Sequence, residues 1–271
     1  MKQNNFKYKK SIYMDDFEIT KQGIVIIQWL NYGDLQLGEE LFHNISNKEN
    51  ERENYFVAFY KVQTKTEFID LLQHLIKTTT KGTLFTLHIV AHGNEDCIGI
   101  SSTECITWKE LFNYTRELNI IMGNNLLLVL SSCVGGGILS YIEPEKRAPY
   151  RAVIANTRKV LMSDAHIGFS AFYADYYNIL DIRKSLEALN TSIDISKTID
   201  GRKKTEFFIM TAEHSFDEIF NPERDPVFFE SIVNKILPLN DSIPQELRVV
   251  KAKEIFKRKG EKLRPFFTFN D

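Results

Sequence analysis

The chain contains few of the residues that mark disulfide-rich, collagenous or linker-like proteins. Only three of its 271 residues are cysteines, Cys97, Cys105 and Cys133, and this odd number is too small for a disulfide framework and leaves at least one thiol unpaired. Thirteen glycines and seven prolines exclude a collagen-like or low-complexity chain. The scarcity of cysteine indicates a reducing compartment, so the question for each thiol is its reactivity rather than its cross-linking.

The sequence also lacks an excess of charge of either sign and any long hydrophobic run. Its 34 basic and 36 acidic side chains give a net charge of −2, which provides no general attraction to nucleic acid or to an anionic membrane. The apolar run at 126–130 is far shorter than the roughly 20 residues that span a bilayer. Residues 1–10 are polar and basic, unlike a secretory signal. We therefore expect a cytoplasmic protein that has neither nucleic acid nor a membrane as its partner.

What the sequence does contain is an alternation of short apolar runs with helical patterns. Nearly continuous apolar runs are typical of strands that are buried on both faces, and apolar side chains three and four residues apart are typical of helices. Strands are predicted over 24–27, 55–60, 84–90, 126–130, 152–155 and 206–210, and helices over 66–77, 107–118, 163–178 and 182–190. The alternation predicts an α/β fold, an α/β/α sandwich around a mostly parallel sheet of about six strands. Thr107 and Glu110 form a predicted capping box.

We expect one domain over residues 1–237 and a basic C-terminal tail over 238–271, packed on the domain or extending from it. Between residues 248 and 264 there are eight lysines and arginines but only two glutamates. This basic segment has two interpretations: a solvated helix packed through its apolar positions, or a docking tail for an acidic partner. The charged stretch at 48–54 is expected to be an exposed connection.

Two of the predicted strands end in residues that carry chemistry. One apolar strand runs straight into His92 and Gly93, and another ends at Cys133, 41 residues after the histidine. A spacing that holds one helix fits a single right-handed crossover, which would make the two strands neighbours. Ligands bind at the carboxyl ends of parallel strands, and a thiol beside an imidazole is activated as a nucleophile. The sequence therefore predicts a Cys–His site at this edge of the sheet.

The glycines near these residues fit the same chemistry. A helix that begins just after Cys133, through the glycines at 135–137, would direct its positive end at the sulfur and favour the thiolate. Gly93 permits close approach of the backbone, so its N–H and that of Cys133 are expected to form an oxyanion hole. Taken singly, Cys133 could be a buried apolar residue and His92 a loop residue; the combination favours the functional interpretation.

Other chemistries have less support. Neither Cys97 nor Cys105 forms a Cys-x-x-Cys pair, and His88, which shares a strand face with His92, lies within an apolar run. We therefore predict no metal site. No phosphate-binding glycine motif follows a predicted strand, so no nucleotide or other cofactor is expected.

At these residues the sequence resembles the caspase-like (clan CD) cysteine peptidases, which include caspases, metacaspases, gingipains, separase and the bacterial CHAT-domain proteases. The matching segments are Ile89-Val90-Ala91-His92-Gly93 and Leu128-Val129-Leu130-Ser131-Ser132-Cys133. A third block, Ala152-Val153-Ile154-Ala155-Asn156 followed by Ser163-Asp164-Ala165 and the aromatic stretch at 169–173, looks most like the CHAT-domain branch. The resemblance covers roughly residues 20–215.

The resemblance implies a role for each matching residue. Cys133 would be the nucleophile and His92 the general base and acid, with the backbone amides of Gly93 and Cys133 as the oxyanion hole. The family works as a dyad, so the resemblance requires no orienting carboxylate or amide. Ser131 stands where caspases carry glutamine and where other relatives carry an acid, so a neutral or apolar P1 residue is preferred. Ser131, Asn156 and Asp164 are candidates for the substrate pocket, although for Asp164 a role as the cap of the following helix is favoured.

These observations lead to two hypotheses. The first is a cysteine endopeptidase that acts on a protein substrate, as in bacterial antiviral defence systems where a related protease activates an effector such as a gasdermin. No separate sensor domain is evident, so its activation is expected to come from a partner, an oligomer or its own termini. The second is a catalytically inactive caspase-like scaffold that serves as a protein-interaction module.

Overall fold

Six strands follow one another across a central sheet in the order β10-β7-β6-β3-β1-β2. The structure is a computed structural model that describes residues 18–46, 53–101, 103–133, 138, 141–143, 146–156, 158–179, 181–193, 198–199, 202–203, 206–220 and parts of 247–267. The six strands are β1 (Lys21–Trp29), β2 (Tyr55–Lys61), β3 (Thr83–Gly93), β6 (Leu127–Ser131), β7 (Ala152–Ala155) and β10 (Phe208–Thr211). Two short strands, β4 (Cys97–Gly99) and β5 (Cys105–Thr107), extend the sheet beyond β3 as a hairpin.

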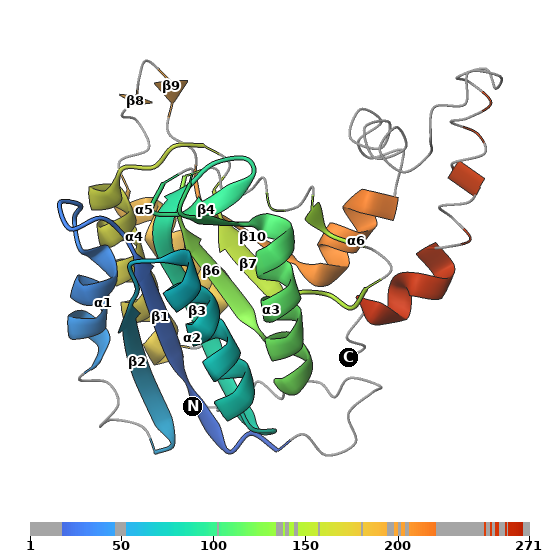
Figure 1. The fold of residues 1–271 in the computed structure, drawn as a ribbon, viewed down its shortest axis with the longest axis horizontal. Helices are drawn as coiled ribbons and strands as arrows, with labels where there is room; N and C mark the ends of the chain where they lie inside the picture. Colours follow the sequence, from blue (N-terminus) through green and yellow to red (C-terminus); the bar gives the residue numbers. More distant parts are fainter. Residues whose placement is uncertain are drawn as a thin grey trace, which may run out of the picture. The chain divides into compact units, whose positions relative to one another are not determined.

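Parallel pairing joins the strands of the sheet. β1 pairs with β2 and β3, β3 pairs with β6, and β6 pairs with β7, all in parallel. Helices cover both faces: α2 (Lys65–Thr78) and α3 (Trp108–Ile121) lie on one, and α1 (Leu37–Ser46), α4 (Met162–Ile179) and α5 (Ile182–Ser192) lie on the other (Figure 1). The predicted α/β class, with a mostly parallel sheet of about six strands between two helical layers, is therefore confirmed. Short β8 (Thr198–Ile199) and β9 (Arg202–Lys203) form a separate two-stranded sheet.

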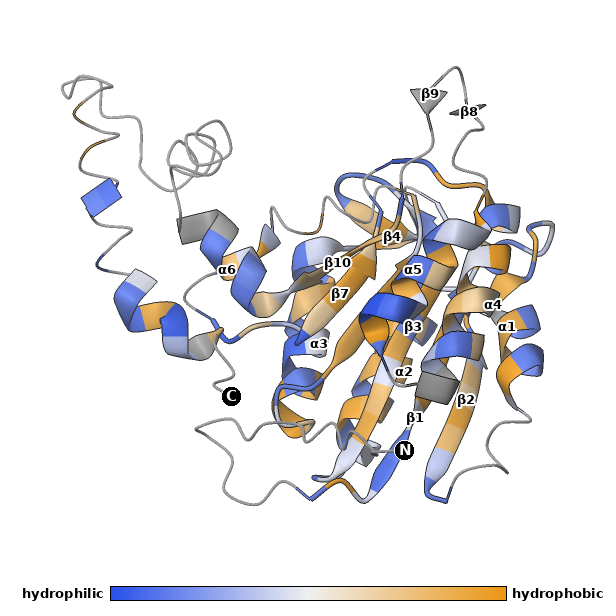
Figure 2. Cartoon of the chain, turned by 180° about the vertical axis from the view of Figure 1, so that it is seen from behind, coloured by the Kyte–Doolittle hydropathy of each residue, from blue (hydrophilic) through white to orange (hydrophobic). Residues whose placement is uncertain are grey.

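The strands form where apolar residues run without interruption, because both of their faces are covered. All five residues of β6 and all four of β7 are buried. The covering helices instead show an apolar face toward the sheet and a polar face outward, as the colouring of Figure 2 shows. Because buried strands and amphipathic helices have these different hydrophobic patterns, the two kinds of element can be distinguished in the sequence.

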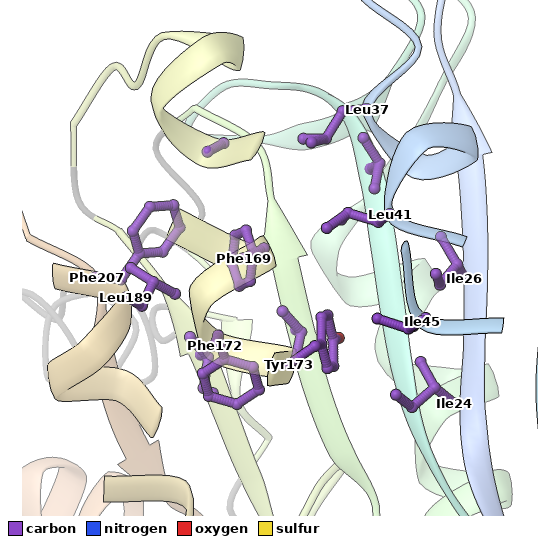
Figure 3. Close-up of a cluster of buried hydrophobic side chains, with 14 of the residues drawn as sticks. Ile24, Ile26, Leu37, Leu41, Ile45, Phe169, Phe172, Tyr173, Leu189 and Phe207 are labelled. Atoms are coloured by element: carbon purple, nitrogen blue, oxygen red, sulfur yellow. The ribbon is translucent and has the colours of Figure 1, made fainter. Parts of the chain in front are cut away.

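The face covered by α1, α4 and α5 holds a cluster of apolar and aromatic side chains. Ile24 and Ile26 of β1 and Leu41 of α1 lie on one side of this cluster, and Phe169 and Phe172 of α4 on the other (Figure 3). On the opposite face the ring of Trp29 stacks on that of Phe68 with centroids 4.8 Å apart. Burial of these side chains fixes both helical layers against the strands whose carboxyl ends carry the candidate site.

Helix α3 begins as its sequence indicates, but its capping box is only half formed. The Thr107 hydroxyl accepts a hydrogen bond from the Glu110 backbone N–H at 3.2 Å. The Glu110 carboxylate does not return the bond, because it accepts one from the Lys65 ammonium at 2.8 Å. The Glu110 carboxylate, which the sequence pattern assigned to the cap of α3, thus pairs with a lysine of α2 instead.

The chain divides into two compact units, one of residues 16–142 and 149–210 and the other of residues 1–15, 143–148 and 211–271. The first, which we call the larger unit, contains His92 and Cys133. In the other unit, the rings of Phe216 on α6 (Ala212–Phe220) and Phe267 beside η3 (Arg264–Phe266) lie 5.1 Å apart. The boundary predicted at 237/238 and about half of the basic segment lie outside the described residues, as does most of the 48–54 stretch.

Candidate functional site

The pairing of β3 with β6 brings the two predicted reactive residues to the same place. Val90 of β3 is the register partner of Ser131 of β6, and His92 and Cys133 each come two residues later. Because side chains alternate along a strand, His92 shares a sheet face with Val90, and Cys133 with Ser131. That face is the one covered by α1 and α4. His92 is exposed and Cys133 is half-buried, so solvent reaches both.

The His92 ring is held by a carboxylate that the sequence analysis did not single out. Nε2 of His92 lies 2.9 Å from Oδ2 of Asp34, in the loop between β1 and α1. Burial raises the pKa of the Asp34 carboxyl, but the hydrogen bonds with His92 and with the Asn31 backbone outweigh it and leave the pKa below its usual value. Asp34 is therefore a carboxylate at neutral pH. Because Nε2 is engaged, Nδ1 is the nitrogen of His92 that remains for proton exchange.

A buried glutamine fixes the loop that carries Asp34. Gln28 of β1 is fully buried, and its Oε1 accepts hydrogen bonds from the backbone N–H groups of Gly38, at 2.8 Å, and Glu39, at 3.1 Å, at the start of α1. Its Nε2 donates to Oε1 of Gln36 at 2.7 Å, and Gln36 donates to the Asp34 carbonyl at 2.7 Å. The side chain of Gln28 thus accepts the N–H groups at the start of α1 in place of a residue of the loop itself, and it fixes the loop on the sheet.

Cys133 is held by the segment that leads into α4. Its Sγ lies 3.8 Å from the carbonyl oxygen of Val160, to which the thiol donates. His92 and Cys133 are both described residues, and neither side chain bonds to the other. The sulfur thus bonds to a backbone carbonyl and not to the imidazole; catalytic hydrogen bonds are often long or unformed in enzymes without substrate. The helix predicted to begin directly after Cys133 involves residues 134–137, which lie outside the described part of the chain.

Gly93 lies against the backbone of the cysteine. A Cβ atom at this position would be 2.7 Å from the carbonyl oxygen of Cys133 and 3.0 Å from Cβ of Ser132, so no larger residue fits. The Asn94 N–H donates to the Cys97 carbonyl at 3.0 Å, which makes Asn94 and Cys97 a hydrogen-bonded pair of the β3–β4 hairpin. The next pair, Gly93 with Ile98, is then a non-hydrogen-bonded one, and the Gly93 N–H points away from β4. This amide is free of the hairpin ladder.

A hairpin that the sequence analysis did not predict shapes the chain after His92. The Asn94 side chain accepts hydrogen bonds from the backbone N–H groups of Asp96, at 2.8 Å, and Cys97, at 2.9 Å. Nε1 of Trp108 donates to the Asn94 carbonyl at 3.2 Å and anchors the turn to α3. The Asn94 side chain closes this turn in the way that asparagine commonly does.

Ser131 belongs to a buried hydrogen-bonded chain beneath the site. Its hydroxyl lies 2.6 Å from Nε2 of His88, and Nδ1 of His88 lies 2.9 Å from the hydroxyl of Tyr173 on α4. Burial lowers the pKa of His88 to about 3 and raises that of Tyr173, so both rings are neutral. Ser131 is 1% exposed and engaged here, and its proposed contact with substrate stays a prediction.

The other two pocket candidates follow β7 in the chain. Asn156, directly after β7, is fully buried; its Nδ2 donates to the Ser132 carbonyl at 3.3 Å and its Oδ1 accepts from the Arg158 N–H at 3.2 Å. Asp164 is buried in the first turn of α4, where its carboxylate complements the positive end of the helix. It does not lie at the cap position, which precedes Met162. Asn156 thus joins the backbone directly before Cys133 to the loop that follows β7, and the substrate roles of both residues stay predictions.

The remaining cysteines lie on the hairpin next to β3. Cys97 is buried on β4, and burial together with the hydrogen bond between the two thiols raises the pKa of Cys105, on β5, to about 11. Among the described residues, no group of three or more histidine, cysteine, aspartate or glutamate side chains is placed to hold a metal ion.

Comparisons with known proteins give no family for this chain. No protein-family model matches it, and no curated protein matches it. The chemistry of the site therefore rests on its own residues. Among these, sequence reasoning missed Asp34 and Gln28, since no local motif connects either residue to His92.

Proposed function

We propose that this chain is a cysteine endopeptidase that hydrolyses peptide bonds of a protein substrate through Cys133 and His92. The observation that carries the proposal is the register of β3 and β6, which brings the ends of the two strands that lead into these residues side by side at the carboxyl edge of the sheet. Asp34 adds a carboxylate at 2.9 Å that orients the imidazole and stabilises its protonated form.

The geometry supports a two-step mechanism. The Cys133 thiol gives its proton to Nδ1 of His92 while its sulfur attacks the scissile carbonyl carbon, and the carbonyl electron pair moves onto oxygen. The N–H groups of Gly93 and Cys133 donate to that oxyanion. The imidazolium then protonates the leaving amine as the C–N bond breaks, which leaves a thioester. Water, deprotonated by His92, attacks the thioester, and the sulfur leaves and regains its proton.

Asp34 has a defined part in these steps. Its carboxylate holds Nε2 of His92, so the ring presents the same nitrogen to the sulfur, the leaving amine and the water in turn. The resemblance to bacterial relatives extends the proposal to an effector protein, such as a gasdermin, as the substrate, with a partner protein as the activator.

The alternative is a catalytically inactive caspase-like scaffold that binds other proteins. One observation favours it: the Cys133 thiol donates to the Val160 carbonyl rather than to His92. If that contact persisted, the imidazole would not generate a thiolate, and Cys133 would be no more nucleophilic than an ordinary thiol.

Competitive alkylation of the three thiols separates these two functions. The native protein is treated with a limiting amount of iodoacetamide at neutral pH, and the label on Cys97, Cys105 and Cys133 is counted by mass spectrometry. The peptidase requires fast labelling of Cys133 that slows in a His92→Ala variant. Equal, slow labelling of all three thiols, unchanged by that substitution, would support the scaffold.

A further inference from the structure

Exposed apolar side chains gather on the two segments that contact the dyad. Among the described residues of the larger unit, five large apolar side chains are exposed, and four of them belong to the β1–α1 loop, the residue before α4 or α4 itself. Single exposed apolar residues are common on protein surfaces, whereas gathering around a reactive site indicates an interaction surface. The five are Tyr32, Leu35, Ile120, Leu161 and Ile167, exposed by 89, 42, 42, 44 and 50% respectively.

Two of these side chains are one residue away from a group that touches the dyad. Leu35 follows Asp34, whose carboxylate bonds to His92, and Leu161 follows Val160, whose carbonyl accepts from the Cys133 thiol. Tyr32, in the same loop as Asp34, lies instead against the Lys61 ammonium at the end of β2, which is 5.3 Å from its ring centroid. An exposed apolar residue therefore directly follows each of the two residues that contact His92 and Cys133.

The helices that carry this surface are held side by side. Helices α1 and α4 pack against each other on the same face of the sheet (Figure 3), and Nδ1 of His166 lies 3.3 Å from the Glu40 carboxylate between them. Ile167, the neighbour of His166, is half exposed on α4. Both helices begin within three residues of the segments that contact His92 and Cys133.

We propose that Leu35 and Leu161, with Ile167 on α4, form an apolar subsite that binds a large aliphatic or aromatic side chain of the substrate next to the scissile bond. We call these three residues the apolar rim. The inference rests on the proposed function and names its substrate class: an extended peptide with an apolar residue at or adjacent to P1. The occupant is a peptide because Leu35 and Leu161 directly follow the two residues that contact His92 and Cys133, and exposed apolar surface is stabilised by removing it from water.

The test measures peptide binding apart from cleavage. Fluorescent peptides that differ only at one position, with leucine, phenylalanine, aspartate or lysine there, are titrated into Cys133→Ala protein and followed by anisotropy. The leucine and phenylalanine peptides are expected to bind about tenfold more tightly than the charged ones, the discrimination typical of one apolar side chain in an apolar subsite. Adding Leu35→Ser or Leu161→Ser should remove most of that difference.

Ile120 supplies the matched control. It is as exposed as Leu35 but lies on α3, on the other face of the sheet, so Ile120→Ser should leave the preference unchanged. Equal binding of all four peptides, preference for aspartate or lysine, or an equal effect of the Ile120 substitution would overturn the apolar rim. The apolar rim would also be overturned if sedimentation equilibrium showed a dimer of the native protein that the Leu161→Ser substitution dissociates. Selective apolar binding without cleavage by the unsubstituted protein would instead overturn the peptidase and leave the rim as a peptide-binding surface.

Discussion

Oδ2 of Asp34 lies 2.9 Å from Nε2 of His92, although 58 residues separate them in the sequence. The contact exists because β1 and β3 are parallel neighbours, so the loop after β1 reaches the carboxyl end of β3. It adds a carboxylate to the expected cysteine–histidine dyad, whose two side chains do not bond to each other in the structure. In the proposed mechanism Asp34 acts through His92, as a positioning residue.

Replacing this carboxylate should slow catalysis without unfolding the protein. In Asp34→Asn, the amide can still bond to Nε2 but does not stabilise the imidazolium, so we expect kcat to fall roughly 10²- to 10⁴-fold with a smaller change in KM. Peptide hydrolysis measured between pH 5 and 9 checks this, and Asp70→Asn on the exposed side of α2 is the matched control. A pH profile and kcat identical to those of the unsubstituted enzyme would show that Asp34 has no role in positioning.

Gly93 offers a test of the oxyanion hole. Gly93→Ala forces the backbone away from Cys133, because the added Cβ would meet the Cys133 carbonyl oxygen at 2.7 Å. We expect about 10²- to 10³-fold lower kcat, the effect of losing one oxyanion donor, and about 1–3 kcal/mol lower free energy of unfolding from the steric conflict. Gly33→Ala is the control, since nothing lies within 4 Å of its added Cβ. Full activity of Gly93→Ala would place the oxyanion elsewhere.

The buried imidazole of His88 makes the stability of the fold depend on pH. Burial lowers its pKa in the native protein from 6.5 to about 3. Between these two values the unfolded chain binds a proton that the native chain does not, so acidification favours unfolding. The resulting loss is about 1.4 kcal/mol in the free energy of unfolding for each pH unit below about pH 6.5. Urea titrations from pH 4 to 8 should give a steeper decline for the native sequence than for His88→Gln, and parallel curves would show that His88 does not titrate in this range.

The hairpin thiols should behave differently from Cys133. With its pKa raised to about 11 by burial and by the hydrogen bond with Cys97, Cys105 has very little thiolate at neutral pH. Its rate of alkylation should therefore increase about tenfold for each pH unit from 7 to 10. Cys97→Ala removes the hydrogen bond and should speed the labelling of Cys105 at pH 8. A rate for Cys105 that does not change with pH would contradict this assignment.

Features that depend on residues close together in the chain were predictable from the sequence. The ends of β3 and β6 were recognised because an apolar run stops directly before His92 and two serines before Cys133, and one helix between them made the strands neighbours. Strands β1 and β3 extend past their predicted limits, and burial by the helical layers continues over the last residues of β1, Gln28 and Trp29.

Features that depend on distant contacts were not predictable. Asp34 lies in an ordinary polar loop, and its role follows only from the pairing of β1 with β3. Gln28 sits within an apolar strand, where no motif indicates that it caps α1. Strands β4 and β5 have three residues each, too few to show an alternating pattern, and depend on the turn at Asn94 and on pairing with β3. The hydrogen bond that draws Ser131 to His88 likewise joins two separate strands.

The most direct test of the peptidase is a digest of a peptide library by the native sequence and by Cys133→Ala, with cleavage sites mapped by mass spectrometry. The native sequence should cut at sites that disappear completely in Cys133→Ala and that carry an apolar residue beside the scissile bond. Identical maps for the two proteins, or no cleavage by either, would contradict the assignment of Cys133 as a catalytic nucleophile.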